Sequence, residues 1–103
     1  MAHEVIVTES AERDLDEILG YIAQNLANPK AAADFADALE RKYTELEHHP
    51  FLFELSRNER LAKKKYRRFV VGNYIALYLV DENNCKVTIA RIFYGAREYE
   101  KYL

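Results

Sequence analysis

Residues 66–80 read YRRFVVGNYIALYLV, and this stretch decides the fold. Its first part, YRRFVV, is rich in the β-branched and aromatic side chains that favour strands. Gly72-Asn73 is a tight hairpin signal, and the YIALYLV run that follows is apolar on both faces. A strand of that kind is covered on both sides. The stretch therefore predicts a hairpin whose second strand lies in the middle of a sheet.

Strand-like runs also lie on either side of this hairpin. Residues 81–84, DENN, form a second turn, and residues 86–94, KVTIARIFY, read as the next strand. Near the start of the chain, residues 3–8, HEVIVT, form a short β-branched run that fits a first strand. The sequence thus predicts four strands, three of them consecutive.

Two apolar stripes at helical spacing separate the first strand from the hairpin. Thr8 or Ser10 can cap the first helix, and Asn28 can cap the second, with Pro29 at its first position and Pro50 after its end. Residues 51–64 are irregular or hold one short turn of helix. The stripes consist of Ala11, Leu15, Ile18, Leu19, Ile22 and Leu26, and of Ala32, Phe35, Ala36, Leu39, Tyr43 and Leu46.

Together these elements predict an α+β protein. It has an N-terminal strand, a helical hairpin, and then a three-stranded antiparallel meander forming one sheet packed on the helices. A length of 103 residues fits a single domain over residues 1–103. The single Cys85 suits a reducing compartment, and neither a signal peptide nor a membrane-spanning run is visible. We expect a soluble, cytoplasmic protein without membrane association.

Charge is sorted along the chain. Residues 1–56 carry twelve acidic and four Lys or Arg side chains, a net charge of −8. Residues 57–103 carry five acidic and eleven Lys or Arg side chains, a net charge of +6. A near-neutral protein with one cationic, tyrosine-rich side is suited to an anionic partner. That partner is a nucleic acid, an acidic protein segment or the protein's own acidic half.

The densest basic stretch runs from residue 57 to residue 68. It leads into a strand, so Arg67 and Arg68 are expected on a rigid element and on opposite faces. Tyr66 and Phe69 interrupt it and are able to stack on bases. The stretch is either a solvated charge run or a surface for a target or nucleic acid, with Lys63, Lys64, Lys65 and Arg67 as its contacts.

Two further arginines lie in or after the last strand. Arg91 is predicted to share a strand face with Val87, Ile89 and Phe93, where it needs a partner. That partner is either a helix acid or a phosphate or acidic ligand. Arg97 follows the strand, and with the tyrosines around it forms a cluster that is able to clamp a phosphate or simply pack on the sheet edge. Those tyrosines are Tyr94, Tyr99 and Tyr102.

Metal and cofactor chemistry is not indicated. His48 and His49 are adjacent and have no Cys or acidic group at ligand spacing. The chain carries no phosphate-binding glycine loop and no hydrolase motif. We expect neither a metal nor a cofactor.

The ordered set of segments resembles the RelE/ParE superfamily of toxins from type II toxin–antitoxin modules. VTESAERDLDEILGYI (7–22) is similar to the family's first strand and opening helix, and LEHHP (46–50) to its helix-ending turn. YRRFVVGNYIALYLVDE (66–82) is similar to its central hairpin, and KVTIARIFYGARE (86–98) to its last strand and basic exit. The resemblance covers nearly the whole chain in the right order.

The resemblance implies a bacterial, growth-inhibiting toxin of the plasmid-stabilisation type that assembles with a cognate antitoxin into a hetero-oligomer. Members of the superfamily either poison DNA gyrase, as ParE does, or cleave mRNA on the ribosome, as RelE does. If this chain is a ribonuclease, Arg68, Arg97 and Tyr102 match the catalytic positions. Ile75 replaces an arginine of the ribonucleases, and the long helical hairpin and isoelectric point near 5.9 are more ParE-like. We therefore favour gyrase, with the ribonuclease and an inactive antitoxin-binding module as alternatives.

Overall fold

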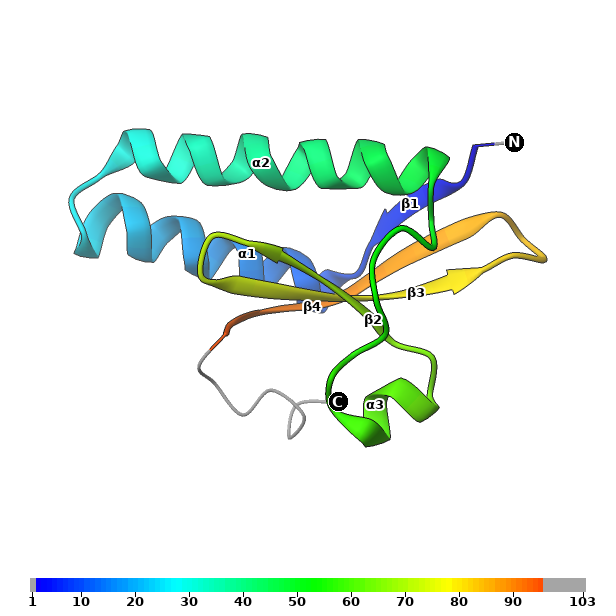
Figure 1. The fold of residues 1–103 in the computed structure, drawn as a ribbon. Coiled ribbons are helices and arrows are strands. Elements are labelled where there is room, and N and C mark those ends of the chain that lie inside the picture. The colour runs from blue at the N-terminus through cyan, green and yellow to red at the C-terminus, as the bar shows by residue number, and fades with distance from the viewer. Residues whose placement is uncertain (1, 96–103) are drawn as a thin grey trace.

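The computed structural model describes residues 2–95, which form one sheet with helices on both of its faces (Figure 1). A long helical hairpin covers one face, and a short helix lies against the other (Figure 1). In chain order the elements are β1 (Glu4–Val7), α1 (Glu9–Gly20), the π-helix η1 (Tyr21–Asn25), α2 (Pro29–His48), α3 (Glu59–Lys63), β2 (Arg67–Val71), β3 (Tyr74–Asp81) and β4 (Lys86–Tyr94).

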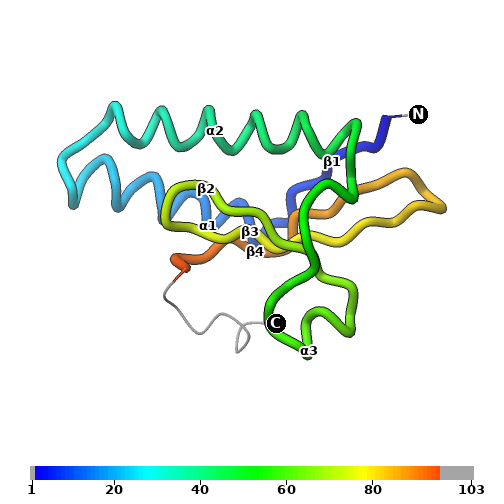
Figure 2. The backbone as a smooth tube through the Cα atoms, viewed as in Figure 1, coloured from blue at the N-terminus to red at the C-terminus, as the bar shows by residue number. Residues whose placement is uncertain are grey.

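The strand order in the sheet is β1-β4-β3-β2. Strands β2, β3 and β4 form the predicted antiparallel meander, while β1 pairs with β4 in parallel. The sheet is therefore mixed. The helical hairpin carries the chain from β1 at one edge of the sheet to β2 at the other. Figure 2 shows the β2–β3 turn at the same end of the molecule as the α1–α2 connection, with the β3–β4 turn at the other end.

Both long helices begin at the caps that the sequence predicts. The Thr8 hydroxyl accepts a hydrogen bond from the Ala11 N–H at 3.1 Å, and the Asn28 side-chain oxygen accepts one from the Ala31 N–H at 3.1 Å. Each cap satisfies a backbone N–H that has no partner within the first turn of its helix. The predicted short turn of helix within residues 51–64 is α3.

The first helix departs from the predicted stripe at its C-terminal end. Residues Tyr21–Asn25 form a π-helix, whose turn is wider than that of an α-helix. Leu26, four residues after Ile22, therefore no longer lies on the same side of the helix as Ile22. Leu26 was predicted to continue the stripe, but its side chain is 56% exposed.

The core has two parts, one on each face of the sheet. Between the helical hairpin and the sheet lie Leu39, Leu46, Phe69, Tyr78, Val87 and Ile89, all nearly or fully inaccessible. On the other face Leu61 of α3 packs with Ile75, Leu77 and Phe93. Strand β3 contributes to both, which confirms the prediction that it is covered on both sides.

A bulge in β4 corrects one sequence prediction. Leu77 pairs with Arg91 and the next residue, Tyr78, pairs with Ile89, so Ala90 is an additional residue on β4. Such an insertion reverses the alternation of side chains. Arg91 therefore lies on the face of Leu77, and not on the helix-covered face of Ile89 as the unbroken alternation predicted.

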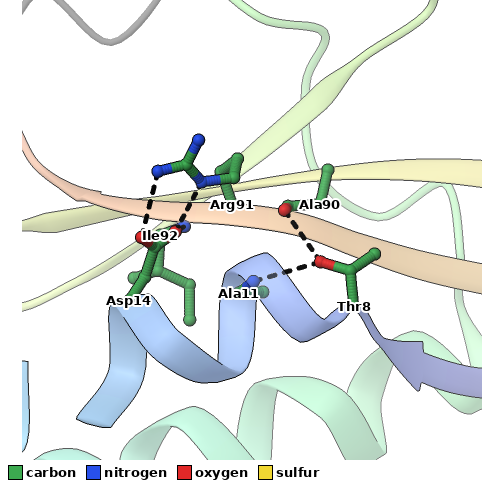
Figure 3. Close-up of polar contacts among 6 residues, drawn as sticks. All are labelled: Thr8, Ala11, Asp14, Ala90, Arg91 and Ile92. Atoms are coloured by element: carbon green, nitrogen blue, oxygen red, sulfur yellow. Dashed lines mark hydrogen bonds and ion pairs between the residues drawn. The ribbon is translucent and has the colours of Figure 1, made fainter. Parts of the chain in front are cut away.

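Side chains from the start of α1 complete the edge of β4 where β1 ends (Figure 3). β1 pairs with β4 from Lys86 to Ile89. Beyond that point the Thr8 hydroxyl donates to the Ala90 carbonyl at 2.9 Å, and one oxygen of Asp14 accepts the Ile92 N–H at 2.9 Å. The same carboxylate takes two hydrogen bonds from the Arg91 guanidinium, at 2.8 and 3.1 Å.

We predict that Asp14→Asn lowers the free energy of unfolding by about 2–3 kcal/mol. Asparagine keeps an oxygen for the Ile92 N–H but removes the charge opposite Arg91, whose side chain is 21% exposed. Urea denaturation measures the change. Asp16→Asn, an exposed acid on the same helix, is the matched control and should change stability by less than about 0.5 kcal/mol. Equal losses in the two variants would contradict the prediction.

Candidate functional site

Two of the predicted arginines lie in one row across the sheet. Arg68 on β2 pairs with Leu77 on β3, and Leu77 pairs with Arg91 on β4. Directly paired residues project to the same face. Both arginines therefore lie on the face opposite the helical hairpin, with their backbones about 10 Å apart. The bulge in β4 is what brings Arg91 into this row.

Arg68 is held at the inner end of a small charge network. Its side chain is only 9% exposed, and its Nη1 lies 3.7 Å from a carboxylate oxygen of Glu54. The backbone N–H of Arg68 also donates to the Glu54 carbonyl at 3.0 Å. Arg57 reaches the same carboxylate oxygen at 3.1 Å from the solvent side. Arg68 thus has the carboxylate of Glu54 as its neighbour at the outer limit of ion-pair distance.

Arg91 binds a helix acid, the first of the two kinds of partner that the sequence analysis considered. Its ion pair with Asp14 is an internal contact with a helix acid, and its guanidinium also lies 4.8 Å from the centre of the Phe93 ring. A bidentate pair with a carboxylate fixes the plane of the guanidinium. A role for Arg91 in binding a target remains a prediction.

Arg67 lies on the opposite face from Arg68, as the alternation of the strand predicts. It donates to the Phe53 carbonyl at 2.7 Å, and its guanidinium lies 4.8 Å from the centre of the exposed Phe51 ring. These contacts brace the loop between α2 and α3. The structure therefore does not bring Arg67 together with the row formed by Arg68 and Arg91.

The lysines lie at the end of α3. Lys63 pairs with Glu59 at 3.7 Å, but both side chains are more than three-quarters exposed, so the pair contributes little. Lys64 follows as the C-terminal cap, and Lys65 adopts a left-handed backbone with φ of 71°. All three lysines are exposed and offer their charges to solvent.

Tyr94 is the last residue of β4, and its ring meets that of Tyr74 edge-on at 5.7 Å. It lies at the end of the sheet and not in the arginine row. Arg97, Tyr99 and Tyr102 lie outside the residues that the structure describes, so their grouping stays a prediction.

The sequence did not reveal a large groove between the helical hairpin and the β2–β3 turn. Its volume is about 1070 Å³. Tyr21, the first residue of η1, lies on its wall because it is one position away from Ile22 in the predicted apolar stripe. The other aromatic and charged lining residues are Phe35, Tyr74, Phe93, Tyr94, Asp14, Glu17 and Asp34.

Burial keeps several phenols in their protonated form. Desolvation raises the pKa of Tyr78 to about 12, and desolvation together with the charge of Glu12 raises the pKa of Tyr43 to about 12. Burial, with smaller contributions from Tyr21 and Tyr94, also raises the pKa of Tyr74. These three side chains stay protonated at neutral pH.

Within residues 2–95, no three His, Cys, Asp or Glu side chains are grouped so that they would hold a metal ion. In the same part of the chain, no helix is long and apolar enough to cross a membrane.

Comparison with known proteins identifies the class to which this fold belongs, the toxins of type II toxin–antitoxin systems. The model of the family described as the ParE toxin of the type II toxin–antitoxin system parDE matches residues 5–99. The chain belongs to this family. The resemblance to the RelE/ParE superfamily is thereby confirmed. No curated protein matches the sequence.

Solved structures of toxin–antitoxin complexes share the fold. A chain of the chromosomal ParDE system from P. aeruginosa aligns with a TM-score of 0.71 at 18% identity, covering 90% of this chain and 96% of that one. A chain of the RelBE2 complex from Mycobacterium tuberculosis gives 0.63 at 22% identity, covering 91% and 99%. A chain of the archaeal RelE–RelB complex from Pyrococcus horikoshii gives 0.60 at 17%, covering 94% and 99%.

The buried tyrosines predict a loss of stability in alkali. The pKa of Tyr78 is about 12 in the folded state and near 10 when unfolded. Between these values the unfolded state loses a proton that the folded state keeps, so the free energy of unfolding falls as pH rises. Urea denaturation across this range measures the slope. Tyr78→Phe should make it shallower, whereas Tyr21→Phe, at an exposed ring that only contributes to the raised pKa of Tyr74, should change it much less. An unchanged slope in Tyr78→Phe would contradict the assignment.

Proposed function

We propose that this protein is a growth-inhibiting toxin that a cognate antitoxin neutralises, and that it acts by binding DNA gyrase and not by cleaving RNA. Membership of the ParE family supports the toxin. The similar solved chains come from toxin–antitoxin systems, and two come from toxin–antitoxin complexes, which supports the antitoxin partner. A gyrase target would place the protein in the cytoplasm.

The main observation in favour of gyrase is that Arg68 and Arg91 contact carboxylates of the protein itself. Cleavage of RNA without a metal requires cations that meet the charge developing on the phosphorane. Arg68 is buried beside Glu54, and Arg91 is bound by both oxygens of Asp14. The guanidinium of Arg91 would have to leave Asp14, and that of Arg68 would have to become accessible from its buried position, before either neutralised a phosphate.

The centre of the same face is apolar. Ile75, at the position where ribonuclease members have an arginine, is 9% exposed and packs with Leu61, Leu77 and Phe93. An additional cation is therefore absent from this position. Cleavage also requires a base for the 2′-hydroxyl. Tyr43, Tyr74 and Tyr78 belong to the cluster between the helical hairpin and the sheet, so these three phenols do not face this surface.

Binding to a protein–DNA target requires exposed charge and not a reactive group. Lys63, Lys64 and Lys65 supply it at the end of α3, on the same face of the sheet as Leu61. We propose that these lysines, together with Arg97, Tyr94 and Tyr99 near the C-terminal end, contact the gyrase–DNA complex. Long-range attraction of this kind weakens as salt increases.

The purified protein is expected to block supercoiling of relaxed plasmid DNA by gyrase or to trap cleaved DNA. Lys64→Glu should weaken inhibition about fivefold or more, because it reverses a charge within the lysine cluster. Lys30→Glu, an exposed lysine on α2, is the control and should inhibit like the wild type. Normal supercoiling at a large excess of toxin would exclude gyrase as the target.

The ribosome-dependent ribonuclease remains the second candidate, since Arg68 and Arg91 share one row on a sheet face. If it is correct, Arg97→Ala abolishes mRNA cleavage on programmed ribosomes. Cleavage by this variant at the wild-type rate would exclude the catalytic role of Arg97. Harmless induction with retained antitoxin binding would instead identify an inactive binding module.

A further inference from the structure

The loop between α2 and α3 carries exposed apolar side chains close together. Phe51 is 46% exposed, Leu52 is 53% exposed and Leu55 is 38% exposed. Within residues 2–95 only seven large apolar side chains are exposed, so almost half of them lie in these five residues. Apolar side chains gathered on a small surface commonly mark an interaction site.

This loop is fixed to the sheet, so its apolar side chains are held outward (Figure 1). The Tyr78 hydroxyl donates to the Pro50 carbonyl at 3.0 Å, and Arg67 donates to the Phe53 carbonyl at 2.7 Å. The inner position of the loop is occupied by Phe53, whose ring centre lies 5.6 Å from that of Phe69 in the core. A surface that is already ordered loses little conformational entropy when it binds.

A hollow of about 500 Å³ lies between this loop and the turn that joins β3 to β4. The loop contributes Phe51 and Leu55 to its lining, and the turn contributes Glu82 and Asn83. Arg67, the first residue of β2, also lines it, and the guanidinium lies 4.8 Å from the centre of the Phe51 ring. The hollow therefore joins the apolar loop to charged groups on two other segments.

The hollow carries charges of both signs. Lys65 and Arg67 line it, and so do Asp81 and Glu82. Among the described residues, no ion pair joins these cations to these carboxylates. Hydrogen bonds from Asn84 lower the pKa of Asp81, so this carboxylate is charged at neutral pH. The charges of the hollow are therefore available to a partner.

The mixture of charges indicates which partner fits. An acidic segment would meet Asp81 and Glu82, and a cationic segment would meet Lys65 and Arg67. A second copy of the chain, related by a two-fold axis, presents the same surface in the opposite direction. Its carboxylates then face the cations of the first copy, and its apolar loop covers the other apolar loop.

We propose that the protein forms a two-fold symmetric homodimer through the loop between α2 and α3 and the β3–β4 turn. Leu52 of each copy packs on the apolar loop of the other, and Arg67 of each copy lies opposite Glu82 of the other. Lys63 and Lys64 do not line the hollow, so this surface meets the one proposed for gyrase only at Lys65. The dimer does not depend on the identity of the toxin's target.

Sedimentation equilibrium of the full-length protein tests the proposal. Over about 1–500 μM it should show monomer and dimer in equilibrium and no larger species, since a small interface gives a weak dimer. Leu52→Glu should raise the dissociation constant at least about tenfold, because it places a charge in the apolar contact. Leu26→Glu is the matched control, since Leu26 is 56% exposed but lies beyond the other end of α2. It should leave the dissociation constant unchanged.

A second pair of variants tests the charges. Glu82→Lys should raise the dissociation constant about fivefold or more, because it turns an attraction into a repulsion. Asp16→Lys, at an exposed acid on α1, should change it less than about twofold. Circular dichroism confirms that each variant is folded.

Three results would overturn the proposal. They are a monomer at every concentration, which would assign the hollow to a different partner, an open-ended larger assembly, and equal effects of Leu52→Glu and Leu26→Glu. The gyrase proposal is tested with Lys64→Glu, which lies outside the hollow. Failure of that proposal and failure of this one are therefore observed separately.

Discussion

The carboxylate of Asp14 connects the helical layer to the sheet, and much of the structure depends on it. β1 has four residues and supports β4 only as far as Ile89. Beyond Ile89, Thr8 donates a hydrogen bond to the Ala90 carbonyl and Asp14 accepts one from the Ile92 N–H. These side chains replace the hydrogen bonds that a longer β1 would make. Because Asp14 also binds Arg91, the same contact orients the side chain that the β4 bulge turns to the open face. Asp14 further contributes to the wall of the groove.

The Asp14–Arg91 contact helps to explain why acidic residues predominate in the first half of the chain and basic residues in the second. The acidic first part of the chain includes the helical hairpin, and the basic second part includes the meander and α3. The two meet at Asp14–Arg91 and at Glu54–Arg68. For these two arginines, the anionic partner is the protein's own acidic half. Exposed charge lies elsewhere, in the lysines after Glu59 and in the carboxylates of Glu17 and Asp34 at the groove.

The features that sequence reasoning predicted are those set by short-range rules. The Gly72 turn, the caps at Thr8 and Asn28, and the doubly covered β3 follow from residue types and spacing. The parallel position of β1, the bulge at Ala90 and the π-helix at Tyr21–Asn25 depend on contacts between distant segments. For that reason the face of Arg91 and the burial of Leu26 were predicted wrongly, and the groove was missed. The helix acid was foreseen as one partner of Arg91, but its identity required the fold.

Hydrogen exchange of the Arg91 Nε–H, followed by NMR in the free protein, tests the central claim most directly. If Asp14 binds this group inside the fold, it should exchange at least about tenfold more slowly than the Nε–H of Arg13. Arg13 is exposed on the same helix as Asp14. The protection should disappear in Asp14→Asn while the protein remains folded. Exchange of Arg91 at the rate of Arg13 in the wild type would show that its guanidinium is free for a target, and would contradict the account.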